Sequence, residues 1–415
     1  MHPFNFVILS HTFYRHLCAM HLQRKDVAIM AVCTGLIVAN IYYIQPLIVL
    51  VSKEFNIPEN VAGSAAYLTQ AGYAAGLLLL VPLGDMMEKR KQILLVTSIA
   101  VLSLIGVAVA PAFWIMQVAC FLLGLSSIVP QLILPLAANL ADAAQRGKVI
   151  GSVMSGLLIG ILLSRTLSGA VGAWLGWRSM FWIAAAICVI IIAIIYKRFP
   201  KNHPSFSGHY GTLMRSLLTL IKTQPVLREA TAISMCSFAV FGSFWTTMVL
   251  LFSNEPYHFT SGQVGLFGLA GAAGALAAPL VGRMGDRGNL RRTISIGLGI
   301  FLFSLLLLYF SRYYVLGFII GIILIDVGQQ AIHVSNQTRV YALIPGARNR
   351  LNTVYMSCSF AGTATGSAIG LYLWKHFNWA GVIAGNIVLI VIAILVLIFS
   401  TKRQMQNKQA VWETV

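Results

Sequence analysis

The longest uncharged stretch of the chain, residues 92–141, reads QILLVTSIAVLSLIGVAVAPAFWIMQVACFLLGLSSIVPQLILPLAANLA. It holds 50 residues without a single Asp, Glu, Lys or Arg. A transmembrane α-helix needs about 20 apolar residues to cross the hydrocarbon core of a bilayer. The stretch is therefore long enough for two spans. Pro111, which follows Ala110, predicts the break between them, because proline ends or kinks a helix.

The composition of the whole chain agrees with a membrane protein. Of the 415 residues, 58% are apolar and 10% are charged, whereas a soluble domain carries roughly 25% charged residues. The mean hydropathy is +0.82. The formal charge of +18 could suggest a nucleic-acid partner, but such a partner needs the positive charge gathered on one surface. Here the basic residues separate uncharged stretches, so we expect contact with membrane lipids and not with nucleic acid.

Further uncharged runs along the chain are long enough to cross a bilayer. Together with residues 92–141 they predict an all-α integral membrane protein with twelve transmembrane helices. Within these runs Arg165 and Asp326 are single charges. The other runs are Val27–Ser52, Asn60–Gly84, Val149–Trp177, Ser179–Tyr196, Ala230–Asn254, Pro256–Gly282, Thr293–Ser311, Tyr313–Thr338, Leu351–Trp374 and His376–Thr401.

The distribution of Lys and Arg predicts the orientation of these spans. If the N-terminus is cytoplasmic, the segments on that side hold 24 of the 29 Lys and Arg residues. The opposite loops hold Lys53, Arg178, Arg312 and Lys375, and Arg165 lies within a span. Because cytoplasmic loops are enriched in Lys and Arg, we expect both termini in the cytoplasm.

Two pairs of landmarks indicate that the chain contains two copies of one six-helix unit. Asp85 and Asp286, each followed by basic residues, lie 201 positions apart, and Trp177 and Trp379 lie 202 positions apart. An even number of spans returns the chain to the same side, so the copies are parallel repeats. The predicted organisation is a cytoplasmic lead (1–26), a first six-helix bundle (27–198), a cytoplasmic linker with a short amphipathic helix (199–228), a second bundle (229–401) and a cytoplasmic tail (402–415).

These features resemble the major facilitator superfamily, over the chain from about Val27 to Thr401. The fifth helix carries small residues at the spacing of the antiporter motif of the 12-helix drug:proton antiporter type, with Gly151, Gly160 and Gly169 in register. The sequence also departs from that type at several positions. Arg165 stands where the motif has proline, and Cys120 stands where the fourth helix usually has arginine.

The resemblance implies that helices 1, 4, 7 and 10 line a central substrate cavity between the two bundles. Each of these helices offers polar or aromatic side chains. A single one of them is commonly a hydrogen-bonded structural residue, and it is the set on four helices that points to a binding site. The candidates for substrate binding, besides Arg165, are Asn40, Tyr43, Gln45, Gln131, Trp245, Gln330 and Gln337.

Asp326 and Arg165 are candidates for function because a charge in hydrocarbon needs a partner, a neutral state or a wet cavity. On the tenth helix Gln330, His333 and Gln337 follow Asp326 at offsets of 4, 7 and 11, which is one helical stripe. Asp326 and His333 are the candidates for proton coupling, since a carboxyl group can become neutral and imidazole titrates near neutral pH. Two roles fit Arg165: an ion pair with Asp326, or a direct contact with an anionic group of the substrate.

The charged turns after the second and eighth helices are the candidates for a gate. Charge pairing and helix capping there would stabilise one conformation. The gate candidates are Asp85, Lys89, Arg90, Asp286, Arg287 and Arg291.

The favoured function is secondary active transport of a small organic molecule by alternating access, most simply export coupled to inward proton flow, in the bacterial inner membrane. An uptake permease or uniporter for a metabolite uses the same scaffold. A membrane-embedded enzyme or receptor is a remote alternative, because the sequence has no HExxH, GxSxG or GxxxxGK[ST] motif. The six Cys show no paired metal-ligand spacing. We therefore expect no cofactor, metal or catalytic residue, and a monomer.

Overall fold

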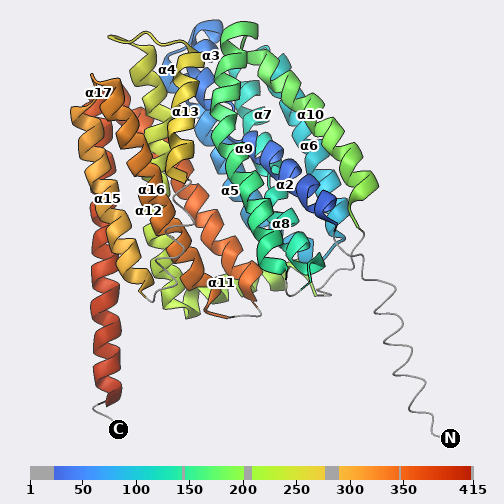
Figure 1. Cartoon of the computed structure of the whole chain (residues 1–415), viewed down its shortest axis with the longest axis vertical. Helices are drawn as coiled ribbons and strands as arrows, with labels where there is room; N and C mark the ends of the chain where they lie inside the picture. The colour runs from blue at the N-terminus through green and yellow to red at the C-terminus, as the bar shows by residue number, and fades with distance from the viewer. Residues whose placement is uncertain (1–22, 143–144, 201–207, 276–288, 345–346, 413–415) are drawn as a thin grey trace, which may run out of the picture.

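Long helices that run side by side form the computed structural model of the chain (Figure 1). It describes residues 23–142, 145–200, 208–275, 289–344 and 347–412, with side chains as far as residue 400. No strand occurs in these ranges. The all-α fold class is therefore confirmed for the part of the chain that the structure describes.

The first half of the chain supplies the elements in blue and green of Figure 1, and each long helix follows one of the predicted runs. The helix before residue 110 ends at Val109 and the next begins at Phe113, which confirms the predicted break at Ala110-Pro111. The elements are α2 (Arg24–Ala39), η1 (Gln45–Leu47), α3 (Ile48–Phe55), α4 (Glu59–Ala62), α5 (Ser64–Leu79), η2 (Val81–Asp85), α6 (Lys89–Val109), α7 (Phe113–Ser126), α8 (Val129–Leu140), α9 (Arg146–Leu175) and α10 (Trp177–Arg198).

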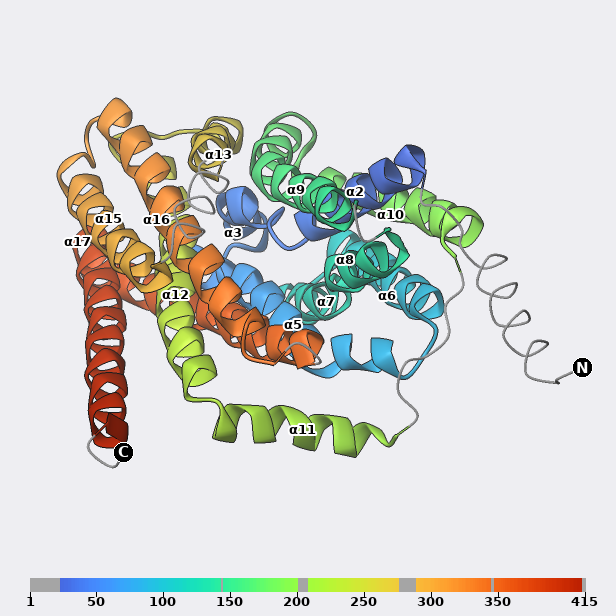
Figure 2. The ribbon, with the colours of Figure 1, turned by 60° about the horizontal axis from the view of Figure 1, so that its bottom comes forward.

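The second half supplies the elements in yellow-green to red. It begins with α11 (Tyr210–Thr223), which crosses the lower face of the molecule between the halves (Figure 2). The Tyr210 hydroxyl donates to the Leu79 carbonyl of the first half at 2.8 Å. The other elements are α12 (Pro225–Ser253), α13 (Ser261–Ala275), α15 (Leu290–Phe310), α16 (Val315–Tyr341) and α17 (Arg348–Trp412).

Nine helices in the described residues are long and apolar enough to cross a membrane. The last of them is α17, which contains a break at Asn378 and so holds two helices in succession. The first predicted span is divided among α2, η1 and α3, and α13 ends at Ala275, where the described range stops. The count of twelve spans stays a prediction.

The two landmark tryptophans occupy similar junctions. Gly176 (φ 82°) lies between α9 and α10, directly before Trp177, and Asn378 (φ 52°) lies directly before Trp379. Glycine and asparagine are the residues that most readily adopt positive φ. Both indole rings are buried, and the Trp379 Nε1 donates to the Leu308 carbonyl at 3.3 Å. The repeat in the sequence is therefore matched by a repeat in local structure.

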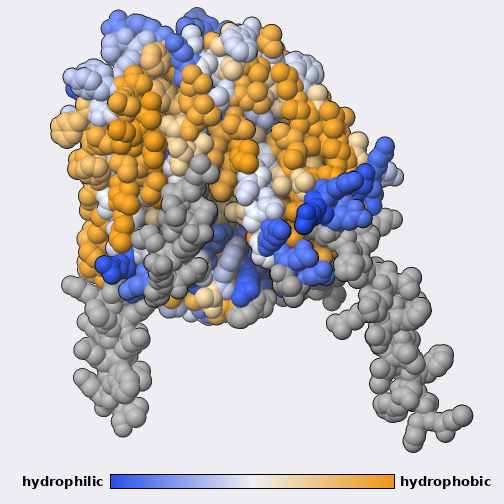
Figure 3. All heavy atoms as spheres, viewed as in Figure 1, coloured by the Kyte–Doolittle hydropathy of each residue, from blue (hydrophilic) through white to orange (hydrophobic). Residues whose placement is uncertain are grey.

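The outer surface carries a broad apolar belt between two more polar ends, as the orange region of Figure 3 shows for one face. Large apolar side chains in this belt are exposed, for example Leu102, Trp114 and Leu316. Soluble monomers rarely expose apolar patches of this size. Lipid is the solvent that such a belt requires.

The helices of each half pack closely where glycines replace larger residues. On α9, Gly160 lies against α2, where a Cβ built on it would lie 2.1 Å from the Gly35 carbonyl oxygen. On α17, a Cβ at Gly366 would lie 1.9 Å from the Ala239 carbonyl oxygen of α12. Small residues allow this approach in membrane helices, where van der Waals packing drives association.

We predict that Gly160→Ala destabilises the protein, because its methyl group meets backbone atoms of α2 that cannot move independently. Overpacking of this kind costs about 1–3 kcal/mol, so the thermal unfolding midpoint of the purified protein should fall by several degrees. Gly151→Ala is the matched control on the same helix, since no atom lies within 4 Å of its Cβ position. Equal midpoints for the two variants would contradict the packing argument.

Candidate functional site

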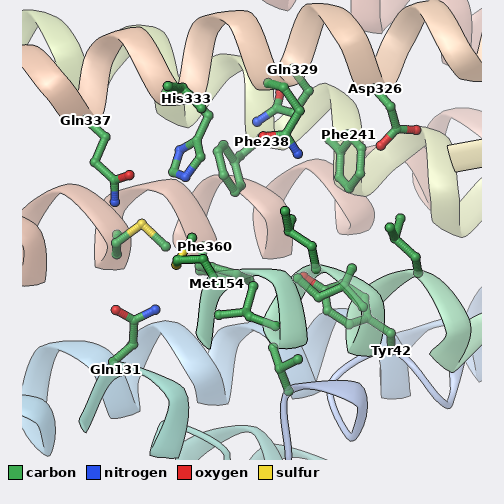
Figure 4. Close-up of a pocket in the computed structure, with 18 of the residues that line it drawn as sticks. Tyr42, Gln131, Met154, Phe238, Phe241, Asp326, Gln329, His333, Gln337 and Phe360 are labelled. Atoms are coloured by element: carbon green, nitrogen blue, oxygen red, sulfur yellow. The ribbon is translucent and has the colours of Figure 1, made fainter. Parts of the chain in front are cut away.

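A cavity lies between the two halves, and both contribute its walls. Its volume is about 1170 Å³, including the space at its open mouth. Side chains of α8 and α9 face those of α12 and α16 across it (Figure 4). Its lining is mostly apolar and aromatic, with a few polar groups. Such a composition is typical of a pocket for a small organic molecule.

The polar stripe on α16 faces this cavity. Figure 4 shows Asp326, Gln329, His333 and Gln337 in a row along one helix, on the side toward the first half. Gln330 also lines the cavity. The polar stripe that the 3.6-residue period predicts on this helix is therefore present in the structure and lines the cavity. It runs from the buried Asp326 to the partly exposed Gln337 at the mouth.

Arg165 is held at the inner end of the cavity, where it is 3% exposed. Its Nε donates to Gln45 Oε1 at 2.8 Å. The guanidinium lies over the Trp245 ring at 4.1 Å and near the Tyr42 ring at 4.7 Å from the centroid. These cation–π contacts and the amide hold the charge in place.

No ion pair within 4.0 Å joins Arg165 to Asp326 among the described residues. Arg165 Nη2 and Asp326 Oδ2 are both buried without a hydrogen-bond partner. The direct ion pair, one of the two roles considered for Arg165, is therefore absent from this conformation. The two charges nonetheless border the same cavity.

Glycines on α13 bring the two charged side chains close to a third helix. A Cβ built on Gly268 would lie 3.2 Å from the Arg165 Cβ, and one on Gly271 would lie 3.2 Å from Asp326 Oδ2. A Cβ on Gly274 would lie 2.5 Å from the Asp326 Cβ. A larger residue at Gly274 would collide with the Asp326 side chain, whereas at Gly268 and Gly271 the neighbouring atoms would have to shift slightly. The small residues of α13 thus lie directly against the two charged side chains.

Beyond Arg165 the halves are in contact, so the cavity is closed on that side. Thr166 Oγ1 of α9 donates to the Gly265 carbonyl of α13 at 2.9 Å. Ser261 Oγ donates to the Gly169 carbonyl at 3.1 Å, between the same two helices. Asn254 Nδ2, after α12, donates to Glu59 Oε2 at 2.8 Å. We call this side the closed end.

The opposite side, where α11, Lys89 and Arg291 lie, is the open end. Along α9 the side chains on the cavity wall change from buried at Arg165 to half-buried at Leu158 and Met154. The cavity wall therefore becomes more exposed toward the end that the positive-inside rule assigns to the cytoplasm.

Polar contacts still join the halves near the open end along one edge. Gln337 Nε2 of α16 donates to Asn352 Oδ1 at 3.3 Å, and Asn352 Nδ2 of α17 donates to Gln131 Oε1 of α8 at 3.2 Å. Gln131 and Gln337 face each other across the cavity in Figure 4. This amide chain places two predicted substrate residues at the mouth of the cavity.

The gate candidates separate into three groups. Asp85 and Lys89 line a small cavity with Asn349 and Arg350 of the other half, as residues of a gate would. Arg90 instead donates to the Tyr196 carbonyl within its own half. Arg291 is paired with Glu229 within the second half at 2.7 Å, and Asp286 and Arg287 lie outside the described residues.

Glu229 forms an ion-pair cluster that sequence reasoning missed. Its side chain is 3% exposed and contacts Arg291 of α15 at 2.7 Å and Arg339 of α16 at 2.8 Å. The cluster joins three helices of one half at the open end. The sequence did not indicate this cluster, because Glu229 lies beside Arg228 at the edge of an apolar run, a position that is typical of solvent-exposed charges.

Four predicted substrate residues lie behind the cavity wall instead of on it. Asn40 contacts the Cys188 sulfur at 3.6 Å, and the Tyr43 carbonyl accepts from Ser168. Gln45 and Trp245 both hold Arg165. Their direct contact with substrate stays a prediction, and in this conformation they support the lining.

The cavity wall also contains residues that the sequence reasoning did not select. Tyr42, and not its neighbour Tyr43, faces the cavity. The helix is interrupted between α2 and η1, so the 3.6-residue helical period does not predict which side chain points inward there. The α9 part of the lining could have been predicted from the sequence. Starting at Met154, the residues at offsets of 3, 4, 7, 8 and 11 form one apolar stripe on the helix, which ends at Arg165. The added lining residues include Tyr42, Tyr73, Met154, Leu157, Ile161, Phe238, Phe241, Gln329 and Phe360.

Comparison with known families identifies the scaffold. The family model "Major Facilitator Superfamily" matches residues 29–287 and 230–414. "Uncharacterized transporter YgaY" of Escherichia coli O157:H7 is 39% identical over 370 residues, which are 89% of this chain and 94% of that protein. "Probable sugar efflux transporter" of Pasteurella multocida is 24% identical over 298 residues, 71% of each chain.

Solved structures of low sequence identity share the fold. The nucleoside transporter NupG has a TM-score of 0.74 at 11% identity and covers 89% of this chain and 98% of its own. The human organic anion transporter MFSD10 has a TM-score of 0.66 at 15% identity, with 90% and 100% covered. An inward-facing, unoccupied bacterial homologue of the lysosomal transporter Spinster has a TM-score of 0.67 at 12% identity, with 91% and 96% covered.

The difference between the two ends of the cavity predicts site-directed thiol labelling. In a background without native cysteines, Met154→Cys should react at least about ten times faster than Ser168→Cys with a membrane-impermeant maleimide, because buried groups react only through local opening. Met154 lines the open part of the cavity, whereas Ser168 is fully buried at the closed end. The reaction should occur in everted vesicles. Faster labelling of the Ser168→Cys variant would contradict the assignment of the open end.

Proposed function

The chain belongs to the major facilitator superfamily and is a multi-pass membrane transporter, and on that premise we propose that it exports a small organic molecule in exchange for protons. The observation that carries the proposal is the placement of Asp326 beside Arg165 at the inner end of a cavity that is open at one end and closed at the other. Alternating access requires such a site, reached from each side in turn.

Asp326 is the principal candidate for the proton site. It is 4% exposed, and no hydrogen bond to its side chain occurs among the described residues. A carboxylate in this position is stabilised by a proton or by a bound cation. Proton and substrate would then compete for one carboxyl group, and such competition is sufficient for exchange.

His333 is a second candidate with a different environment. Its Nδ1 lies 3.1 Å from the Tyr355 hydroxyl, and its ring stacks on Tyr355 and meets the edge of Phe238. This side chain already has a hydrogen-bond partner in the protein, unlike Asp326. We assign it the weaker effect on coupling.

The direction of transport and the location are part of the proposal. The open end carries the basic residues Lys89, Arg90 and Arg291, so a substrate would enter this conformation from the cytoplasm if both termini are cytoplasmic. The name of one relative as a sugar efflux transporter supports export. We place the protein in the bacterial inner membrane as a monomer. The alternative is an uptake permease or uniporter that uses the same cavity.

Proton exchange can be tested with a panel of compounds from several chemical classes. Everted vesicles that contain the protein are acidified by respiration and monitored with quinacrine while chloramphenicol, ethidium, sugars, nucleosides and apolar amino acids are added in turn. A transported compound should release protons and restore fluorescence, and Asp326→Asn should abolish this response while the protein still inserts into the membrane. Glu255→Gln is the control, because it neutralises an exposed carboxyl group in a loop.

Each alternative gives a different result. Accumulation of a radiolabelled hit that survives a protonophore would reject coupling and leave the transporter assignment intact. Accumulation in right-side-out vesicles, driven by the same gradient, would indicate uptake instead of export. A normal response from Asp326→Asn would show that the proton site lies elsewhere, and His333→Gln would be the next variant to measure.

A further inference from the structure

Three side chains at the inner end of the cavity are buried without complete hydrogen bonding. Arg165, Asp326 and Gln329 are 3%, 4% and 5% exposed. Arg165 Nη2, Asp326 Oδ2 and both polar atoms of the Gln329 amide have no hydrogen-bond partner. All three residues line the same cavity. Native proteins leave few buried polar groups unpaired, and each such group calls for an explanation.

The two side chains carry opposite charges but make no direct ion pair with each other, and Arg165 Nη2 and Asp326 Oδ2 each have no hydrogen-bond partner among the described residues. A ligand with one charge would bind one of these atoms and leave the other buried without a hydrogen bond, which is unfavourable. A ligand that carries both an anionic and a cationic group would satisfy both at once. The net charge of this pair of residues is zero, which matches a ligand that is neutral overall.

The spacing of the two groups limits the size of the charged part of the ligand. The Arg165 Cζ lies 4.1 Å from the centroid of the Trp245 ring, and the Cβ position of Gly271 lies 3.0 Å from Cζ2 of that ring and 3.2 Å from Asp326 Oδ2. The guanidinium and the carboxylate therefore both approach the same indole ring. The α-carboxylate and α-ammonium groups of an amino acid are attached to one carbon atom, so they can reach two partners that lie near one ring.

The remainder of the cavity would surround an apolar body. Phe238 and Phe241 of α12, Phe360 of α17 and Met154 and Ile161 of α9 line the space between the charged end and the mouth. The Phe238 and Phe360 rings lie 5.8 Å apart. Figure 4 shows Phe238, Phe241, Phe360 and Met154 between the Asp326 end and the Gln337 end. Apolar and aromatic side chains of a ligand gain from burial here.

We propose that the substrate is a zwitterion of the α-amino-acid class with an apolar or aromatic side chain. Arg165 binds the carboxylate, Asp326 binds the ammonium group, and the Gln329 amide contributes a further hydrogen bond. The proposal rests on the proposed function, since it assigns the substrate class of the same cavity. It is independent of whether transport is coupled to protons.

Three compounds with one phenyl body separate the possible ligand classes. L-phenylalanine carries both charges, phenethylamine carries the cation alone and 3-phenylpropanoate carries the anion alone. Equilibrium binding of each is measured at neutral pH on the purified full-length protein in nanodiscs. We expect phenylalanine to bind about tenfold or more tightly than either of the others, because each lost charge contact costs about tenfold in affinity.

Variants should change ligand preference in opposite ways. Asp326→Asn removes the partner of the ammonium group, so phenylalanine should lose its advantage over 3-phenylpropanoate. Arg165→Lys keeps a positive charge but loses the planar fork that binds a carboxylate in bidentate fashion, so phenylalanine should weaken about tenfold while phenethylamine is unchanged. Glu255→Gln is the control and should preserve the order of the three affinities. Thermal unfolding of each variant confirms that it is folded.

Equal affinity for phenylalanine and phenethylamine would overturn the proposal in favour of a cation site. Equal affinity for phenylalanine and 3-phenylpropanoate would overturn it in favour of an anion site, and no detectable binding of the three compounds would also overturn it. These binding results do not involve a pH gradient. A protein that binds phenylalanine selectively yet releases no protons in vesicles would reject the coupling and retain the substrate class.

Discussion

A charge cannot remain in the hydrocarbon of a bilayer without a partner, and this constraint organises the centre of the molecule. Arg165 meets it through the Gln45 amide and the Tyr42 and Trp245 rings, which come from the interrupted first helix and from α12. The α-helix is interrupted between Ala39 and Ile48, in a stretch that contains Pro46, whose nitrogen has no hydrogen to donate. The same charge thus joins the two halves at the point where the cavity ends.

Small residues make that arrangement possible and also give the cavity its direction. Gly265 and Gly169 allow α9 and α13 to touch on one side of Arg165, while the side chains of α9 on the other side are progressively exposed. The contact between α9 and α13 consists of short side chains and few hydrogen bonds, so breaking it and forming a similar contact elsewhere costs little free energy. Such an interface is suited to two discrete arrangements of the halves, as transporters of this superfamily require.

Asp326 links the energetics of the site to its function. Burial without a hydrogen-bond partner raises the free energy of its charged form, so a proton or a cationic ligand stabilises the site. The shared fold with NupG and MFSD10, at 11% and 15% identity, indicates the scaffold and not the ligand. Substrate specificity therefore depends on the residues of this cavity, in which an acidic and a basic side chain lie near a wall of aromatic rings.

The membrane class, the family and the stripe from Asp326 to Gln337 could be predicted from the sequence, because hydropathy and helical period are local properties. The sequence also indicated Arg165 and Gln131 as cavity residues. The packing of distant segments established that Tyr42 and not Tyr43 faces the cavity, and that Gln45 and Trp245 support Arg165 behind the wall. It also decided that Glu229 pairs with Arg291 and Arg339. These outcomes depend on helix phase across a break and on contacts between residues about 60 to 120 positions apart, which no local pattern encodes.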